Sequence, residues 1–145
     1  MFKRILLPTD GSDLSLRAVD LGIALAAQLG ASVYAFHAMQ PFEAVPYFTD
    51  MMLFPEDAYE KAVEERAVHC LEQTKERAKA ANVSWDGHHE YAHQPYEAII
   101  QAAKDQHCDL IVIGSHGRTG LDRLFLGSQT AKLLPNCDIP VLVCH

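Results

Sequence analysis

Apolar runs and amphipathic stretches alternate along the chain and predict nine regular segments. Short runs rich in Val, Ile, Leu and aromatic residues predict buried strands, whereas apolar residues three or four positions apart predict helices. Strands are expected at 3–8, 31–38, 83–91, 109–113 and 139–144, and helices at 13–29, at 56–81, from Pro95 onwards and at 128–134. This alternation of strand and helix predicts a mostly parallel sheet with helices on both faces and right-handed crossovers.

The helices carry predictions of which face is buried. Ser12 or Asp13 can cap the first helix, and Gly30 can end it. Helical spacing predicts that its buried face comprises Leu14, Ala18, Leu21, Leu25 and Leu29. For the helix at 56–81 the predicted buried face comprises Tyr59, Val63, Ala67, Cys70, Leu71, Thr74 and Ala78, opposite a solvated charged face.

Segment 39–55 combines three prolines with many apolar side chains and therefore predicts irregular structure. Free exposure of so much apolar surface is unfavourable, so we expect the segment to be covered. It could pack as a flap on the core of its own domain, or it could form a lid or an interface with a partner.

Polar side chains at 83–91 predict a strand at an edge of the sheet. His88 and His89, with Glu90 and His93 nearby, raise the question of a metal site. Adjacent side chains on a strand point to opposite faces, which disfavours a shared ion. We expect exposed histidines on an edge strand instead.

Composition narrows the class of protein. The 145 residues suit a single domain, and a formal net charge of −7 lacks the basic footprint of a nucleic-acid-binding protein. No apolar run approaches about 18 residues, so neither a signal peptide nor a membrane span is expected. The four cysteines are scattered without a CxxC pair, which argues against a zinc site and predicts a reducing compartment, the cytoplasm. A surface meeting of Cys137 and Cys144 would leave a redox role open.

The most distinctive stretch is the glycine-rich segment Gly114–Ser128, between a buried strand and the start of a helix. Glycine allows backbone N–H groups to approach an anion, and a helix N-terminus adds donors and a favourable dipole. The segment contains no Lys, which excludes the P-loop signature. Either this segment binds phosphate, or it is a surface loop whose glycines only form turns.

Topology offers a second loop for the same site. If the strand order is 3-2-1-4-5, the order reverses between the first and fourth strands, and ligands bind at such reversals. Pro8, Thr9 and Asp10 would then lie beside Gly114–Ser128. The two loops together favour a nucleotide site over a generic phosphate site.

The spacing Gly114-x-x-Gly117, nine residues, then Gly127-Ser128 resembles the signature of the ATP-binding branch of the universal stress protein family. The stretches 5–12, 109–120 and 139–143 are also similar to that family, so the match spans essentially the whole chain. The resemblance implies one domain over 1–145, with an α/β, Rossmann-like fold of the adenine nucleotide alpha hydrolase-like type. Its open five-stranded parallel sheet would have the order 3-2-1-4-5. One departure is His93-Gln94-Pro95, because the family often has Gly two residues before this Pro.

The resemblance also implies roles for individual residues. Asp10, in the loop with Pro8 and Thr9, would contact the ribose or a Mg²⁺ ion on the phosphates, although it could merely form an Asx-turn. The backbone around Ala38 would meet the adenine. Arg118 and Arg123 could neutralise the γ-phosphate or face solvent. The phosphates would be held by the Ser128 and Thr130 hydroxyls and by backbone N–H groups of Gly114, Gly117, Gly127, Ser128 and Gln129.

These observations predict an ATP-binding regulatory protein of the stress response, without nucleic-acid or membrane partners. The resemblance implies a homodimer that pairs through the last strand, 139–144. One alternative is an enzyme that hydrolyses ATP slowly or transfers a phosphoryl group, with Asp10 holding the metal and Arg118 stabilising charge. Since His116 has no partner visible in the sequence and the Lys is missing, we expect nucleotide to be held rather than cleaved. The other alternative is a nucleotide-free dimeric scaffold that acts through 39–55.

Overall fold

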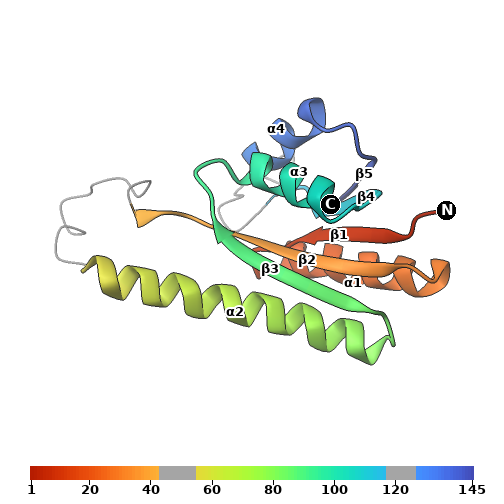
Figure 1. The fold of residues 1–145 in the computed structure, drawn as a ribbon, viewed down its shortest axis with the longest axis horizontal. Coiled ribbons are helices and arrows are strands. Elements are labelled where there is room, and N and C mark those ends of the chain that lie inside the picture. Colours follow the sequence, from red (N-terminus) through yellow and green to blue (C-terminus); the bar gives the residue numbers. More distant parts are fainter. Residues whose placement is uncertain (43–54, 117–126) are drawn as a thin grey trace.

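A computed structural model describes residues 1–42, 55–116 and 127–145. Strands and helices alternate along the described chain (Figure 1). In chain order they are β1 (Arg4–Pro8), α1 (Asp13–Leu29), β2 (Ser32–Met39), α2 (Glu56–Ala80), β3 (Trp85–Tyr91), α3 (Pro95–Asp105), β4 (Leu110–Gly114), α4 (Ser128–Asn136) and β5 (Val141–Cys144).

All strands form one parallel sheet, in the order β3-β2-β1-β4-β5. This confirms the predicted fold class and strand order. β1 is the central strand, and its Leu6 pairs with Tyr34 of β2 on one side and with Ile111 of β4 on the other. β3 lies at an edge, as its polar sequence predicts.

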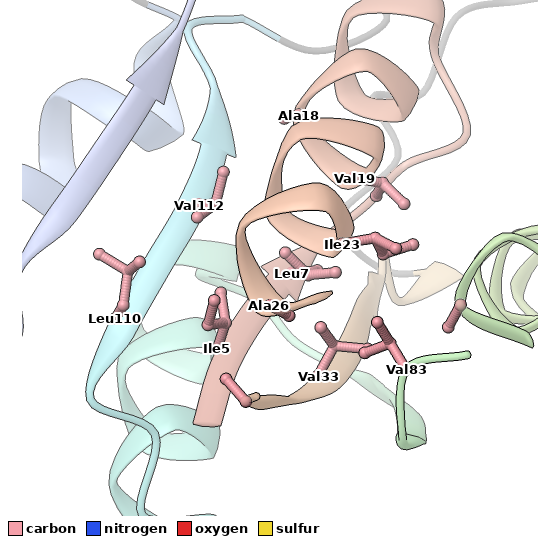
Figure 2. Close-up of a cluster of buried hydrophobic side chains, with 12 residues drawn as sticks. Ile5, Leu7, Ala18, Val19, Ile23, Ala26, Val33, Val83, Leu110 and Val112 are labelled. Carbon is pink, nitrogen blue, oxygen red and sulfur yellow. The ribbon is translucent and has the colours of Figure 1, made fainter. Parts of the chain in front are cut away.

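Helices cover both faces of the sheet, with α1 and α2 on one side and α3 and α4 on the other (Figure 1). Figure 2 shows the core under α1, where Ile5 and Leu7 of β1 and Val112 of β4 face Val19 and Ile23 of the helix. The opposite core contains alternate residues of the same strands, including Leu6, Phe36 and Ile111, packed against α3 and α4. Burial on both faces explains why the central strands are almost continuously apolar.

The predicted buried face of α1 is only partly correct, because Ala18 is buried and Leu14 and Leu25 are partly buried, whereas the other two leucines are exposed. Leu21 and Leu29 are 46% and 39% exposed, whereas the buried residues are Ser15, Ala18, Val19, Gly22, Ile23 and Ala26. Gly22 explains the choice, because a Cβ there would overlap Leu7 Cδ2 and lie 3.5 Å from Val112 Cβ. Small side chains allow α1 to lie close to the sheet, so Leu21 and Leu29 are rotated away from it.

The ends of α1 and the buried face of α2 agree with the sequence. Ser12 is the N-cap of α1, and its side chain accepts a hydrogen bond from the Ser15 N–H group. Gly30 ends the helix in the left-handed conformation, at φ 65°. In α2, six of the seven predicted residues are buried and Tyr59 is partly buried.

One further hypothesis from the sequence, that Cys137 and Cys144 meet, is tested by the described residues. Cys144 packs against the core under α1, whereas Cys137 packs against the core under α3 and α4. The proposed meeting of these cysteines is therefore wrong, because they lie on opposite faces of the sheet. His88 and His89 contact Glu90 and Glu64 respectively, and no group of metal-binding side chains forms among the described residues.

Segment 39–55 lies mostly outside the described residues, which include its start but not 43–54. Met39 is buried, and Phe42 makes an edge-to-face ring contact with Tyr59 of α2. In the described part of the chain, no helix has the length and apolar character needed to span a membrane.

Candidate functional site

A cavity of about 540 Å³ opens at the carboxyl ends of β1, β2 and β4, where the strand order reverses. The predicted residues that line it come from four separate segments of the chain. They are Pro8, Thr9, Asp10, Ala38, Gly114, Gly127, Ser128, Gln129 and Thr130. Two other predicted residues, Gly117 and Arg118, lie outside the described residues, as does Arg123. The topology thus brings together the turn at Pro8–Asp10 and the described ends of the segment Gly114–Ser128.

Six residues that line the cavity were not predicted as site residues. They are Ser15, Phe36, Pro95, Ile99, Ile113 and His116. Phe36 could have been found from periodicity, because it precedes Ala38 by two positions on a strand and shares its face. With Ile99 and Ile113, Phe36 gives the cavity an apolar wall suited to a flat ring.

The turn between β1 and α1 is held by side-chain hydrogen bonds. Asp10 Oδ1 accepts from the Ser12 N–H group at 3.0 Å, which is the Asx-turn considered as an alternative. The Gly11 N–H group donates to Thr9 Oγ1 at 3.2 Å, and the Asp10 N–H group donates to Ser15 Oγ at 3.2 Å. A carboxylate has about four lone-pair sites, so the Asx-turn leaves Asp10 able to accept further bonds at the cavity.

The backbone of Ala38 faces the cavity because β1 ends before β2 does. The Phe36 carbonyl points toward β1, where it accepts from the Thr9 N–H group at 2.9 Å. Alternate residues of a strand direct their N–H and C=O groups to the same side, so Ala38 also points toward β1. The paired part of β1 ends at Pro8, opposite Phe36. Ala38 therefore offers a donor and an acceptor, side by side, beyond the last pair of the ladder.

The N-terminus of α4 forms another wall of the cavity. Among the described residues, no side chain caps this helix, and the first N–H groups of a helix have no partner within it. These groups, the Ser128 hydroxyl and the helix dipole favour an anion.

Two of the predicted phosphate donors are already used within the protein. The Gly127 N–H group donates to the Ser115 carbonyl, and the Thr130 hydroxyl donates to the Gly114 carbonyl at 2.9 Å. These bonds fix the start of α4 to the end of β4. In the structure described, the donors that remain at this wall are the Ser128 hydroxyl and the N–H groups of the first turn of α4.

Gln129 connects the two helices on this side of the sheet. Its Oε1 accepts from the Tyr96 N–H group in the first turn of α3, at 3.1 Å. That bond orients the side-chain amide, because Oε1 must face the N–H donor. The N-termini of α3 and α4 are thereby held together at the cavity.

Two histidines lie close to the cavity. His37 is 6% exposed, and its Nδ1 lies 2.7 Å from the Thr9 carbonyl oxygen, so the neutral ring donates this bond. Burial lowers the pKa of His37, against the opposing effects of the Thr9 carbonyl and of Asp10. His116 lines the cavity, and its Nδ1 lies 3.1 Å from Ser115 Oγ.

The side chains that line the cavity suit a metal ion only when the ion arrives bound to a ligand such as a nucleotide. Asp10 is the one carboxylate among the described residues that line the cavity. Mg²⁺ is commonly bound by one or two carboxylates together with substrate phosphates and water. Asp10 thus fits a Mg²⁺ ion that arrives with a nucleotide.

Comparisons with known proteins extend over nearly the whole chain. A family model for the universal stress protein family matches residues 1–145. The universal stress protein MJ0531 of Methanocaldococcus jannaschii is 34% identical over 146 residues, covering 99% of this chain and 82% of the relative. The solved structure of MJ0577 from the same organism has a TM-score of 0.82 at 28% identity, covering 99% of this chain and 96% of that one. A universal stress protein solved in complex with cAMP has a TM-score of 0.72 at 28% identity, with coverage of 99% and 97%.

Proposed function

Because the chain belongs to the universal stress protein family, we propose that it is a cytoplasmic, ATP-binding regulatory protein of the stress response. The observation that carries this proposal is the cavity at the strand reversal, which is lined by the turn at Pro8–Asp10 and by the described ends of the segment Gly114–Ser128. The complex of a 28% identical family member with cAMP supports an adenine nucleotide as the class of ligand.

The strand order suggests how the nucleotide lies. β2, β1 and β4 are neighbours in that order, and each ends at the cavity. At the end of β2, the Ala38 N–H group matches the acceptor N1 of adenine, and the Ala38 carbonyl matches its N6 amino group. The apolar wall of Phe36 and Ile99 lies beside them. At the end of β1, Asp10 would meet the ribose or Mg²⁺. After β4, the N-terminus of α4 would hold the phosphates.

We propose that ATP is held rather than cleaved. Phosphoryl transfer needs a positioned nucleophile together with metal and charge stabilisation. Asp10, the only carboxylate among the described cavity residues, would be engaged by the ribose or the metal and could not also orient a water molecule. The protein would then act through the difference between its occupied and empty states, which ATP shifts by its differential affinity for them.

Titration calorimetry with ATP and Mg²⁺ tests the proposal. We expect binding by the wild-type protein and, for Asp10→Asn, a loss of affinity of about tenfold to a hundredfold. That range corresponds to losing a charge-assisted contact of about 1.5–3 kcal/mol. Asp105→Asn is the matched control, because Asp105 is exposed at the end of α3 and contacts Gln101. The control should bind like the wild type.

Two results would contradict the proposal. One is the absence of any heat of binding at millimolar ATP, and the other is sustained phosphate release that Asp10→Asn abolishes. Mass spectrometry of the small molecules released from denatured protein gives an independent check, in which we expect an adenine nucleotide.

A further inference from the structure

Thr9 and Ser15 form a buried pair of hydroxyl groups at the end of the central strand. Their oxygens lie 2.7 Å apart, and each residue is 5% exposed. Thr9 follows β1, whereas Ser15 lies in the first turn of α1, so the pair joins the strand to the helix. Both residues line the cavity.

Each hydroxyl oxygen already accepts a backbone hydrogen bond. Thr9 Oγ1 accepts from the Gly11 N–H group, and Ser15 Oγ accepts from the Asp10 N–H group, both at 3.2 Å. The pair has two hydroxyl protons, and the bond between the oxygens uses one of them. The described residues provide no acceptor for the second proton. One donor of the pair is therefore available at the cavity.

We propose that this donor binds a ribose hydroxyl oxygen, so that the Thr9–Ser15 pair distinguishes nucleotides that carry this hydroxyl from analogues that lack it. The inference rests on the proposed nucleotide site. β1 lies between β2 and β4, so the pair lies between the adenine subsite at Ala38 and the phosphate subsite at α4. That intermediate position belongs to the ribose.

Asp10 complements the pair chemically. A ribose hydroxyl is both a donor and an acceptor, whereas an ionised carboxylate only accepts. Asp10 can accept the proton of the sugar hydroxyl, and the Thr9–Ser15 pair can donate to its oxygen. Because Ser15 Oγ also holds the Asp10 N–H group, the same pair positions the carboxylate.

Affinities of the wild-type protein for ATP, 2′-deoxy-ATP and 3′-deoxy-ATP give the first test. We expect one deoxy analogue to bind about threefold to tenfold more weakly than ATP, as for one hydrogen bond lost. The analogue that binds weakly identifies the hydroxyl concerned. Equal affinities for all three ligands would overturn the inference without any variant, while leaving the nucleotide site itself supported. A protein that binds none of them would overturn the proposed function as well.

Variants then test whether the pair is responsible. In Thr9→Val/Ser15→Ala, which removes both hydroxyls, we expect ATP and the discriminated analogue to bind equally. Thr9→Ser keeps both hydroxyls and should retain the discrimination. Circular dichroism and thermal melting check that each variant folds. If the pair has only a structural role, the double variant should lose affinity for all three ligands alike. Persistence of the discrimination in the double variant would overturn the assignment.

Discussion

A single buried side chain, His37, connects the sheet to the turn that carries Asp10. Its Nδ1–H group donates to the Thr9 carbonyl, and the ring shares a face of β2 with Met39, which packs against α2. The charged groups around it oppose one another, since Asp10 favours the protonated ring whereas His89 and Arg66 disfavour it. Burial is the largest effect and keeps the ring neutral.

The free energy of unfolding should therefore fall as the pH is lowered toward the pKa of His37 in the folded protein. The folded pKa is below the ordinary 6.5, so at slightly acid pH the unfolded chain binds a proton that the native state does not. Stability from this residue is present above about pH 6.5 and is lost as the pH falls toward the folded pKa. The loss is about 1.4 kcal/mol for each pH unit that separates the folded pKa from the unfolded one. Urea unfolding at pH 7.5 and pH 5.5 measures the change.

Two variants isolate this effect. His37→Asn keeps a donor near Nδ1 but cannot take up a proton, so its stability should depend less on pH than that of the wild type. His107→Asn is the control, because His107 is exposed and its φ of 53° suits Asn. Equal pH dependence in the wild type and His37→Asn would contradict the prediction.

Individual site residues differ in how far the sequence could reveal them. Asp10 and Ser128 stand next to glycines at informative spacing, so they could be predicted. Ser15 could not, because a serine three residues after an N-cap serine is an ordinary start to a helix. Its partner Thr9 is six positions away, and their hydroxyl bond exists only in three dimensions.

Among the elements, α1 departs most from its predicted arrangement. Its leucines follow helical spacing as well as its buried residues do, so periodicity alone could not choose between the two faces. The choice depends on how closely the helix approaches the sheet. Gly22 over Leu7 sets that approach, and the close contact depends on a residue with no side chain at all.

Gly22→Ala tests this account of α1. Alanine favours a helix over glycine by about 1 kcal/mol, but overpacking a buried site costs about 1–3 kcal/mol. Leu7 is fully buried and has little room to move, so we expect a net loss of stability of about 1–2 kcal/mol in chemical unfolding. The exposed Ala24→Gly measures helix propensity alone, with an expected loss of about 1 kcal/mol. Stabilisation by Gly22→Ala would refute the account.

At the scale of the whole molecule, the predicted homodimer would depend on β5. This strand lies at an edge of the sheet, and Leu142 on it is 39% exposed. The Pro140 and Cys144 carbonyls accept bonds from the N–H groups of Ile111 in β4 and of Ser115 just after it, so Leu142 between them also faces β4. The backbone groups of Val141 and Val143 therefore face outward, where a second copy could pair with them.

Val143→Pro tests the proposed homodimer through 139–144. Proline removes an outward N–H group and leaves the ladder with β4 intact, so we expect monomers in sedimentation experiments. Val143→Ala keeps the N–H group and should remain dimeric. Circular dichroism checks that both variants are folded, and a folded dimer of Val143→Pro would exclude pairing through this edge.

The fold as a whole was more predictable than the site. The order of strands and helices follows from local patterns, whereas neighbouring strands such as β1 and β4 are brought together by topology. The cavity depends on that topology, and so do the outward backbone groups of Ala38. Its finer hydrogen bonds, such as that from Thr130 to Gly114, depend on side-chain positions that no periodicity encodes.

The central position of β1 has a consequence for synthesis of the chain. Arg4 at its start contacts Asp109, 105 positions later, and Leu6 completes its second ladder only with Ile111. A nascent chain would carry β1 with one edge unpaired until β4 had been made, which exposes it to aggregation. The cavity needs α4 as well, so a nucleotide could stabilise only chains that extend through α4.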